Sequence, residues 1–312
     1  MRKILLLSIL LGTLLISSCT SRQPIRLLYW NIQNGMWADQ PNNYDNFVEF
    51  VKSQHPDICV WAEAKSLYFD GTSKGFTDDL LRYLPSNWDV LAARYGHDYV
   101  YLGGYRDNYP QVITSRYPIK NMKRIVGELP DSLVAHGAGW AQIEIQGKTY
   151  NIVTLHTWPM SYTLNASNRE ESTARGEGNI YRRVEMEYIC NNSVLTHPNA
   201  SNENWLMMGD FNSVSRVDND YYQYPADSTA FLTHDFIREQ TPYRDVVKEL
   251  HSDGIEKTTF YRRIDFVYAT PAMMDHIVSA DVIREGYPKH EKLGISNFWN
   301  PSDHLPILVV WK

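Results

Sequence analysis

Two polar side chains that could handle water and phosphate follow a short apolar run. Residues 205–213 read WLMMGDFNS, an apolar run typical of a buried strand that leads to a carboxylate, Asp210, and an amide, Asn212. In extended backbone, residues i and i+2 point the same way, so both side chains are expected to project together from the strand end. The alternative is an ordinary turn, in which Asp, Asn, Ser and Gly are all common.

Further polar residues stand where other apolar runs end or are interrupted. These residues are Asn31, Glu63, His156, Asp265, Asp303 and His304. Several polar strand ends are what a site at one edge of a sheet requires. Singly, each has a structural alternative. Glu63 could be a solvated loop acid, His156 a buried histidine, and Asp265 the ion-pair partner of the nearby Arg263.

The rest of the chain predicts the elements that would position these residues. Apolar runs predict strands over residues 26–30, 57–62, 90–92, 99–102, 112–114, 125–126, 140–145, 150–155, 264–269, 278–283 and 305–310. Helices are predicted over 44–54, 76–84, 243–250 and 182–190, the last within a longer element beginning near 169, and a loop over 218–235. No Pro/Gly/Ser linker divides them. This pattern favours one α/β or α+β domain with two packed sheets and helices outside.

The N-terminus predicts export. Arg2 and Lys3 precede an apolar run over residues 4–16, which is too short to span a bilayer and suits a secretory signal. Cys19 follows Ile-Ser-Ser and resembles the bacterial lipoprotein processing box, which would leave a lipidated cysteine at the cell envelope. An ordinary cleaved signal with an incidental cysteine is the alternative. The expected organisation is a signal peptide over 1–18, a tether over 19–25 and a single domain over 26–312.

Composition bounds the partners and the redox chemistry. Of 30 basic and 36 acidic residues, cleavage after residue 18 removes two basic ones, which leaves a net charge of −8. This charge weighs against a processive duplex-DNA binder, although local cations could still form a groove. After Cys19 only Cys59 and Cys190 remain, too few for a disulfide framework, and Cys59 is expected to be a buried thiol.

Taken in order, seven short motifs resemble the endonuclease/exonuclease/phosphatase superfamily. They are YWN at 29–31, WAE at 61–63, VITSRYPI at 112–119, LH at 155–156, GDFN at 209–212, ID at 264–265 and SDHLP at 302–306. The resemblance covers the chain from about residue 26 to its end. It implies a four-layer αββα sandwich, with two mainly antiparallel sheets flanked by helices and a site at one end of the sheets.

The resemblance also implies a divalent metal. Glu63 would hold one or two Mg²⁺ or Mn²⁺ ions, assisted by Asn31 and Asp303. Oxygen ligands of this kind suit a hard cation.

The same resemblance implies roles for the other polar residues. Asp210 would orient or deprotonate the attacking water, and Asn212 would position the water or the phosphate. Asp265 would fix the tautomer of His304, and His156 would bind phosphate or protonate the leaving oxygen. Phosphodiester hydrolysis needs charge stabilisation on the non-bridging oxygens, an in-line water and help for the leaving group, and this set supplies all three.

The substrate is less well specified. The chain has Ala64 after Glu63, and Tyr-Pro-Gln before the SRYP segment, where many relatives differ. Candidate substrate-contacting residues are Tyr101, Tyr105, Arg106 and His136. Candidate loop aromatics are Trp37, Trp158, Tyr221, Tyr222, Tyr224 and Trp299. Candidate groove cations are Lys65, Arg106, Arg169, Arg175, Arg216 and Arg263.

Three functions are consistent with these residues. The first is an extracytoplasmic, metal-dependent nuclease or phosphodiesterase with a phosphate-ester substrate that could be nucleic acid. The second is a hydrolase of phospholipid, sphingomyelin or inositol phosphate, which a membrane tether would suit. The third is a lipoprotein that kept the fold and only binds a ligand. A monomer without protein partners is expected.

Overall fold

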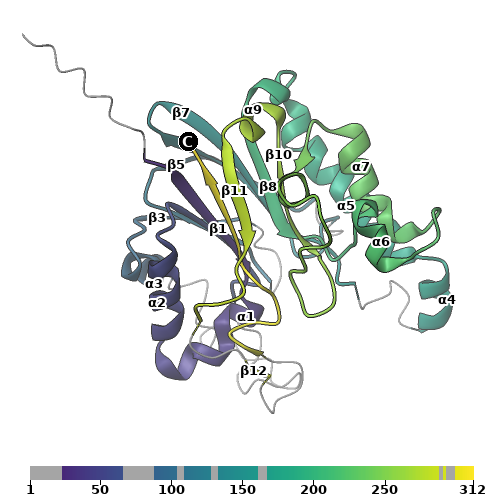
Figure 1. Cartoon of the computed structure of the whole chain (residues 1–312), viewed down its shortest axis with the longest axis horizontal. Coiled ribbons are helices and arrows are strands. Elements are labelled where there is room, and N and C mark those ends of the chain that lie inside the picture. Colours follow the sequence, from purple (N-terminus) through teal and green to yellow (C-terminus); the bar gives the residue numbers. More distant parts are fainter. Residues whose placement is uncertain are drawn as a thin grey trace, which may run out of the picture.

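Two six-stranded sheets pack against one another, with helices on their outer faces. The computed structural model describes residues 23–65, 88–103, 109–127, 133–160, 167–287, 291–292 and 299–312. Figure 1 shows helices α2 and α3 on one outer side and α5 and α7 on the other. The predicted αββα sandwich is therefore confirmed.

The first sheet is mixed. Its strands, in spatial order, are β11 (Ile277–Val282), β14 (Ile307–Trp311), β1 (Ile25–Asn31), β2 (Ile58–Ala62), β4 (Val112–Ser115) and β3 (Tyr99–Leu102). Only β1 and β2 run parallel; the other neighbours are antiparallel.

The second sheet is built in the same way, with a single parallel pair, β7 and β8, among antiparallel neighbours. Its strands, in spatial order, are β5 (Ile119–Ile125), β6 (Ala138–Ile145), β7 (Lys148–His156), β8 (Asn204–Asp210), β10 (Asp265–Ala269) and β9 (Arg244–Asp245). A separate two-stranded sheet pairs β12 (Glu291–Lys292) with β13 (Trp299–Asn300).

The helices are mostly short. They are α1 (Gln33–Met36), α2 (Asp45–Gln54), α3 (Trp88–Arg94), α4 (Arg169–Ala174), α5 (Glu177–Asn191), α6 (Asn219–Tyr222), α7 (Leu232–Gln240), α8 (Val246–Leu250) and α9 (Pro271–Met274). No helix among the described residues is long and apolar enough to cross a membrane.

Strand alternation explains both the layers and the position of the polar strand ends. In β1, Leu27 and Tyr29 belong to the core between the sheets, whereas Leu28 and Trp30 pack with the residues of α2 and α3. In β8, Leu206 and Met208 likewise face the inner core. Because side chains alternate along a strand, the next inward-facing positions are residue 31 of β1 and residue 210 of β8. Both polar ends therefore open into the space between the sheets.

A hairpin joins the two strands predicted over residues 140–145 and 150–155, whose connection reads Gln-Gly-Lys. Strands β6 and β7 pair from Ala138–Leu155 to Ile145–Lys148. The two turn residues, Gln146 and Gly147, have φ values of 52° and 77°. Positive φ at both central positions is the type I′ arrangement that matches the twist of the flanking strands.

Two predicted elements were wrong, and two others have different bounds. Residues 90–92 lie in helix α3 and not in a strand, because Trp88, Leu91 and Ala92 form its buried face while Val90 is 62% exposed. The predicted loop over 218–235 contains α6 and the start of α7, whose buried Phe236 and Ile237 lie beyond the polar stretch.

The helix predicted over residues 243–250 begins only at Val246. Arg244 and Asp245 pair with β10 instead, and the Asp245 side chain caps α8 by accepting a hydrogen bond from the Lys248 N–H. The element predicted to begin near residue 169 is divided into α4 and α5 at Gly176, which has a φ of 64°.

Several predictions lie outside the described residues. They are the signal peptide over 1–18, the lipidated Cys19, most of the tether over 19–25, the helix over 76–84, and the substrate candidates Tyr105 and Arg106. Of the cysteines, Cys59 and Cys190 are both buried and free, as expected for Cys59.

A buried histidine supports the outer face of the first sheet. His97 Nε2 donates to the Pro56 carbonyl at 2.9 Å, which leaves Nδ1 to accept from the Thr114 hydroxyl at 2.9 Å. The Tyr95 hydroxyl lies 3.1 Å from the same Thr114 oxygen. Burial lowers the pKa of His97 to about 4, so the imidazole is neutral at pH 7 and this hydrogen-bond pattern is maintained.

Acid should therefore destabilise the fold through His97. Above pH 6.5 the ring is neutral in both states; between pH 6.5 and about 4 only the unfolded chain binds the proton. The free energy of unfolding falls across that window, by about 3 kcal/mol from this group. Urea titrations of His97→Gln from about pH 7.5 to about pH 4 should show a shallower fall than wild type. His55→Gln, at an exposed position, is the control, and an unchanged slope in His97→Gln would contradict the assignment.

Candidate active site

Three polar residues form one row across the second sheet. In the strand register, Asp210 of β8 lies beside His156 of β7 and opposite Asp265 of β10. Neighbouring strands are about 4.8 Å apart, so the pairing alone brings these side chains together. All three are buried.

The first sheet contributes the opposing residues. Asn31 ends β1, Glu63 follows β2, and Asp303 and His304 precede β14. Ser302 ties these segments together: its hydroxyl donates to the Asn31 carbonyl at 2.7 Å and accepts from the His304 N–H at 3.1 Å. Residues predicted at separate strand ends thus share one space, and Asn31 and Asp210, 179 positions apart in sequence, are in direct contact.

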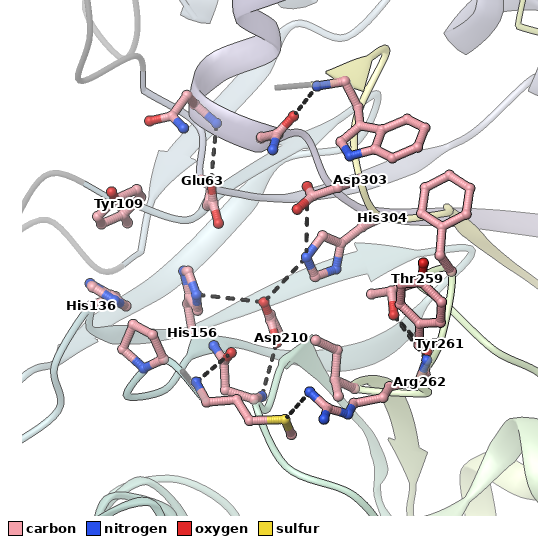
Figure 2. Close-up of a pocket in the computed structure, with 18 of the residues that line it drawn as sticks. Glu63, Tyr109, His136, His156, Asp210, Thr259, Tyr261, Arg262, Asp303 and His304 are labelled. Carbon is pink, nitrogen blue, oxygen red and sulfur yellow. Dashed lines mark hydrogen bonds and ion pairs between the residues drawn. The ribbon is translucent and has the colours of Figure 1, made fainter. Parts of the chain in front are cut away.

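One carboxylate oxygen, Asp210 Oδ2, lies at the centre of this space (Figure 2). Asn31 Nδ2 donates to it at 3.1 Å, and the Nε2 atoms of His156 and His304 lie 3.6 and 3.8 Å from it. The other oxygen, Oδ1, accepts from the Asn212 N–H at 2.9 Å. Burial, reinforced by the negative charge of Asp265, raises the pKa of Asp210 to about 7.

Asp265 orients His304. Its Oδ2 accepts from His304 Nδ1 at 2.7 Å, and its Oδ1 accepts from the Tyr29 hydroxyl across the sheets at 2.7 Å. Although burial disfavours the imidazolium, the carboxylates of Asp265 and Asp303 raise the pKa of His304 well above its usual value. His304 therefore carries a proton on each nitrogen at neutral pH, with Nε2 directed toward Asp210.

The ion pair considered between Asp265 and Arg263 is not formed. Arg263 is 1% exposed and points elsewhere, pairing with Asp218 at 3.0 Å and with Asp245. Adjacent strand residues face opposite sides, but Arg263 lies two positions before Asp265 and precedes the strand itself, so alternation does not determine its direction.

Asn212 reaches the site by a different route from the one predicted. Strand β8 ends at Asp210, and Asn212 has a left-handed φ of 46° because its N–H turns back to the Asp210 side chain. Its amide then accepts from the Met160 N–H at 3.0 Å and donates to the Thr157 carbonyl at 3.2 Å. Asn212 thus borders the cavity while fixing the loop after β7.

His156 differs from His304 in its charge. Its Nδ1 atom is buried and has no hydrogen-bond partner among the described residues. Burial, together with the charges of His136 and His304, lowers the pKa of His156 well below its usual value. The His136 ring lies 4.4 Å from the His156 ring. The site therefore holds one neutral and one protonated imidazole around the same carboxylate.

The acids beside Asn31 fit a hard cation. Glu63 accepts from Asn31 Nδ2 at 3.2 Å and from the Asn34 N–H at 3.0 Å, while the buried Asn34 Oδ1 has no donor among the described residues. Burial and the charge of Asp303 raise the pKa of Glu63, and burial raises that of Asp303. No described Lys or Arg forms an ion pair with either acid. These carboxylate and amide oxygens have no positively charged side chain beside them, and they are the ligands that Mg²⁺ or Mn²⁺ prefers.

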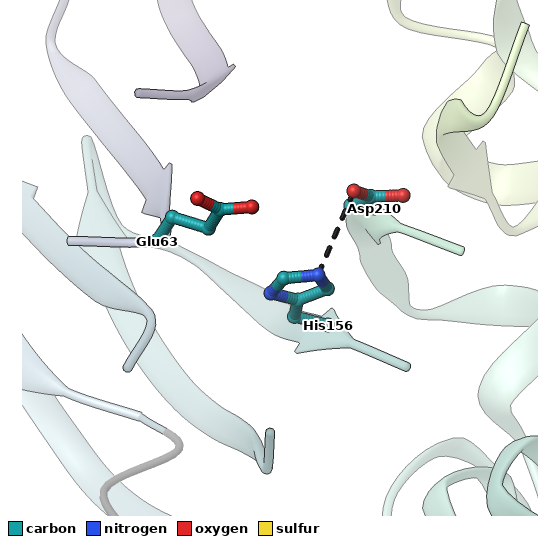
Figure 3. A group of neighbouring side chains, drawn as sticks. All are labelled: Glu63, His156 and Asp210. Atoms are coloured by element: carbon teal, nitrogen blue, oxygen red, sulfur yellow. Dashed lines mark ion pairs between the residues drawn. The ribbon is translucent and has the colours of Figure 1, made fainter. Parts of the chain in front are cut away.

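Asn31 supports this set through its nitrogen. Its Oδ1 accepts from the Gln33 N–H at 3.1 Å, and its Nδ2 donates to both Glu63 and Asp210. In this orientation Asn31 positions the two carboxylates through its Nδ2 atom, and its oxygen is not directed at a metal ion between them. Figure 3 shows Glu63, His156 and Asp210, whose potential ligand atoms lie within 4.8 Å of one another.

These residues border a cavity of about 880 Å³. Such a volume suits a small ligand or one end of a chain, because pockets for small molecules span about 300–1,000 Å³. The cations that border it are Arg262 and Lys292; the predicted groove cations Lys65, Arg169, Arg175, Arg216 and Arg263 do not. Arg216 and Arg175 instead form ion pairs with nearby acids on the protein surface.

The aromatic wall was predicted only in part. Trp158 and Trp299 border the cavity as expected, as does His136, but Trp37, Tyr101, Tyr221, Tyr222 and Tyr224 do not. Tyr109, Phe260 and Tyr261 were missed. Phe260 stacks on Trp299 with ring centroids 4.1 Å apart. The pairing joins the loop before β10 to β13, which the sequence order alone does not reveal.

Comparisons with known proteins agree with this geometry. Residues 28–304 match the Endonuclease/Exonuclease/phosphatase family. A search of the curated proteins found no match.

Solved structures share the fold at low sequence identity. An AP endonuclease from Archaeoglobus fulgidus is 15% identical, with a TM-score of 0.61 and coverage of 92% of this chain and 99% of that one. The 3′ phosphatase NExo from Neisseria, bound to a product DNA hairpin, is 14% identical, with a TM-score of 0.58 and coverage of 92% and 99%. The human Nocturnin catalytic domain with bound sulfate is 14% identical, with a TM-score of 0.56 and coverage of 93% of each chain.

Proposed function

The chain belongs to the endonuclease/exonuclease/phosphatase family, and we propose that it is a metal-dependent phosphodiesterase or nuclease in which Asp210 handles the attacking water. The observation that carries the proposal is the convergence of Asn31, His156 and His304, from both sheets, on Asp210 Oδ2 within 3.8 Å. A carboxylate held this way can orient a water and take its proton, and a pKa of about 7 suits a general base near neutral pH.

The two histidines would act on different oxygens of the reacting phosphate ester. Protonated His304, fixed by Asp265, presents Nε2–H to a non-bridging oxygen, where negative charge must be stabilised. Neutral His156, flanked by His136, contacts the phosphate or assists the leaving oxygen. Asn212 keeps the loop from Thr157 to Met160 in place at the cavity wall.

Glu63 and Asp303 would hold the metal, with Asn34 Oδ1 as an additional oxygen donor. When bound, a Mg²⁺ or Mn²⁺ ion would neutralise the phosphate charge and polarise its oxygens. The aromatic wall with Phe260 and Trp299 supports a nucleotide as the group carried by the phosphate, since aromatic side chains stack on bases.

We further propose that the enzyme works outside the cytoplasm. The basic start, the apolar run over residues 4–16 and Cys19 support a lipid-anchored form in the cell envelope.

Replacing Asp210 should abolish hydrolysis without unfolding the chain. Asp210→Asn keeps the shape and removes the base, so kcat should fall by about 10³-fold. The assay compares bis(p-nitrophenyl) phosphate, plasmid DNA, RNA, sphingomyelin and phosphoinositides, with exposed Asp220→Asn as control. Full activity in Asp210→Asn would refute the role of Asp210. A wild-type chain that binds Mg²⁺ but hydrolyses none of these substrates would favour a ligand-binding lipoprotein, and preference for the lipids would favour the membrane-lipid alternative.

Removing the Glu63 charge should weaken metal binding. Glu63→Gln should raise the Mg²⁺ or Mn²⁺ dissociation constant by at least about tenfold, measured by calorimetry and by the metal dependence of hydrolysis. Exposed Glu49→Gln should match the wild type. Chelation with EDTA should stop hydrolysis, and added Mg²⁺ should restore it. Equal metal affinity in Glu63→Gln and wild type would show that other residues bind the metal.

Replacing Cys19 should release the protein from the membrane. In a bacterial host that processes lipoproteins, Cys19→Ser should lose incorporation of labelled fatty acid and appear in the soluble fraction. Labelling and membrane retention unchanged by Cys19→Ser would contradict lipidation at this residue.

A further inference from the structure

A second cavity of about 250 Å³ adjoins the site. It shares Met160 and Arg262 with the larger cavity, so the two lie on either side of these residues. Figure 2 shows Arg262 at the edge of the larger cavity, on the side of Asp210 away from Glu63. The second cavity is otherwise bordered by residues from α5 and from the segments after β8 and α6. These residues are Asn179, Arg182, Val214, Tyr224, Ser228 and Ala230.

Arg182 is an unusual residue in this wall. It is 2% exposed, and its guanidinium donates only to neutral acceptors: the Trp158 and Pro159 carbonyls at 3.1 and 3.3 Å, and the Asn179 side chain. Its Nε–H has no acceptor among the described residues. Among the described residues no carboxylate lies within ion-pair distance. The charge of the buried Glu185, on the same helix, acts on Arg182, but the Glu185 oxygens accept from the Ala135 and Trp158 N–H groups and not from the guanidinium. The buried Nε–H is therefore left as an unused donor, which costs free energy unless an acceptor such as an anion reaches it.

The other described residues of this wall are also without negative charge. Arg262 is exposed, and its guanidinium contacts the Met160 sulfur at 3.1 Å. The described lining contains these two guanidiniums and no carboxylate, with the hydroxyl groups of Ser228 and Tyr224 beside them. Arginine is well suited to phosphate, because its planar fork donates paired charge-assisted hydrogen bonds.

We infer that this cavity binds a second phosphate group of the substrate, through Arg182 and Arg262, while the scissile phosphate lies beside Asp210. This inference rests on the proposed hydrolase function and narrows its substrate class to phosphate esters that carry another phosphate nearby. Met160 and Arg262 border both cavities, so one molecule can extend from Asp210 into the second cavity. The second phosphate comes either from the adjacent nucleotide of a strand or from another position of an inositol ring.

The test compares two substrates that differ by one phosphate. Thymidine 3′-(p-nitrophenyl phosphate) carries one phosphate, and its 5′-phosphorylated form carries two. The purified full-length chain should cleave the second with a kcat/KM about tenfold higher, as expected for a charge-assisted contact. A second comparison measures cleavage of inositol 1,4-bisphosphate against inositol 1-phosphate. The pair in which the doubly phosphorylated substrate is preferred identifies whether the second phosphate belongs to a nucleotide or to an inositol ring.

Filling the cavity should remove the preference alone. Ala230→Met narrows the second cavity and leaves the residues around Asp210 in place, so it should lower kcat/KM about tenfold for the doubly phosphorylated substrate and leave the other unchanged. Exposed Ala226→Met is the control. Arg262→Gln, at an exposed position that tolerates substitution, should lower the same preference. Equal cleavage of both substrates by wild type, or equal losses on both in Ala230→Met, would overturn the inference.

A binding measurement separates this inference from the hydrolase function. Calorimetry with inorganic pyrophosphate on Asp210→Asn requires no turnover. Binding that Ala230→Met weakens about tenfold would support the subsite even if no substrate were cleaved. Hydrolysis without any such binding or preference would leave the hydrolase intact and refute the subsite.

Discussion

The site depends on burying several carboxylates together between two sheets. Asp210 and Asp265 lie side by side on the second sheet, and Glu63 and Asp303 approach from the first. Buried carboxylates are unfavourable unless each receives hydrogen bonds. Two donors cross between the sheets: Asn31 reaches Asp210 as well as Glu63 of its own sheet, and the Tyr29 hydroxyl reaches Asp265. The contacts that satisfy the acids therefore also hold the ends of the two sheets in register.

Much of this arrangement follows from strand alternation and could be predicted. Once β1 and β8 are identified as strands with both faces buried, residues 31 and 210 must follow the inward-facing set. The short motifs then identify which polar residues belong together. The His304–Asp265 contact was expected only from the family resemblance, and His304 Nδ1 lies 2.7 Å from Asp265 Oδ2. Local pattern and residue type sufficed here because each residue sits at the end of a regular element.

The sequence-based predictions failed where long-range contacts or irregular backbone determine the position of a residue. The partner of Asp265 is Tyr29, 236 residues away, and no local pattern distinguishes it from the nearby Arg263. Asn212 is not extended because its N–H donates to the Asp210 side chain. Asp and Asn side chains can form such local hydrogen bonds with the backbone in place of strand pairing. The residues at 90–92 looked like a strand because the run is short, whereas Trp88 and Leu91 show the helical face only when the flanks are included.

Chemistry and recognition consequently occupy different parts of the fold. The acids and histidines lie at strand ends, which the sheets hold rigidly, whereas Arg262, Phe260 and Trp299 lie in the segments around them. Arg182 reaches the second cavity from α5, and its hydrogen bonds to Trp158 and Pro159 also fix the loop that Asn212 holds. Although the net charge of the chain is negative, an anion could bind at the second cavity, because the electrostatic potential there depends on the nearby guanidinium groups more than on the net charge. If the second cavity binds phosphate as proposed, a few local cations would select the substrate, while the acids between the two sheets would carry out the chemistry.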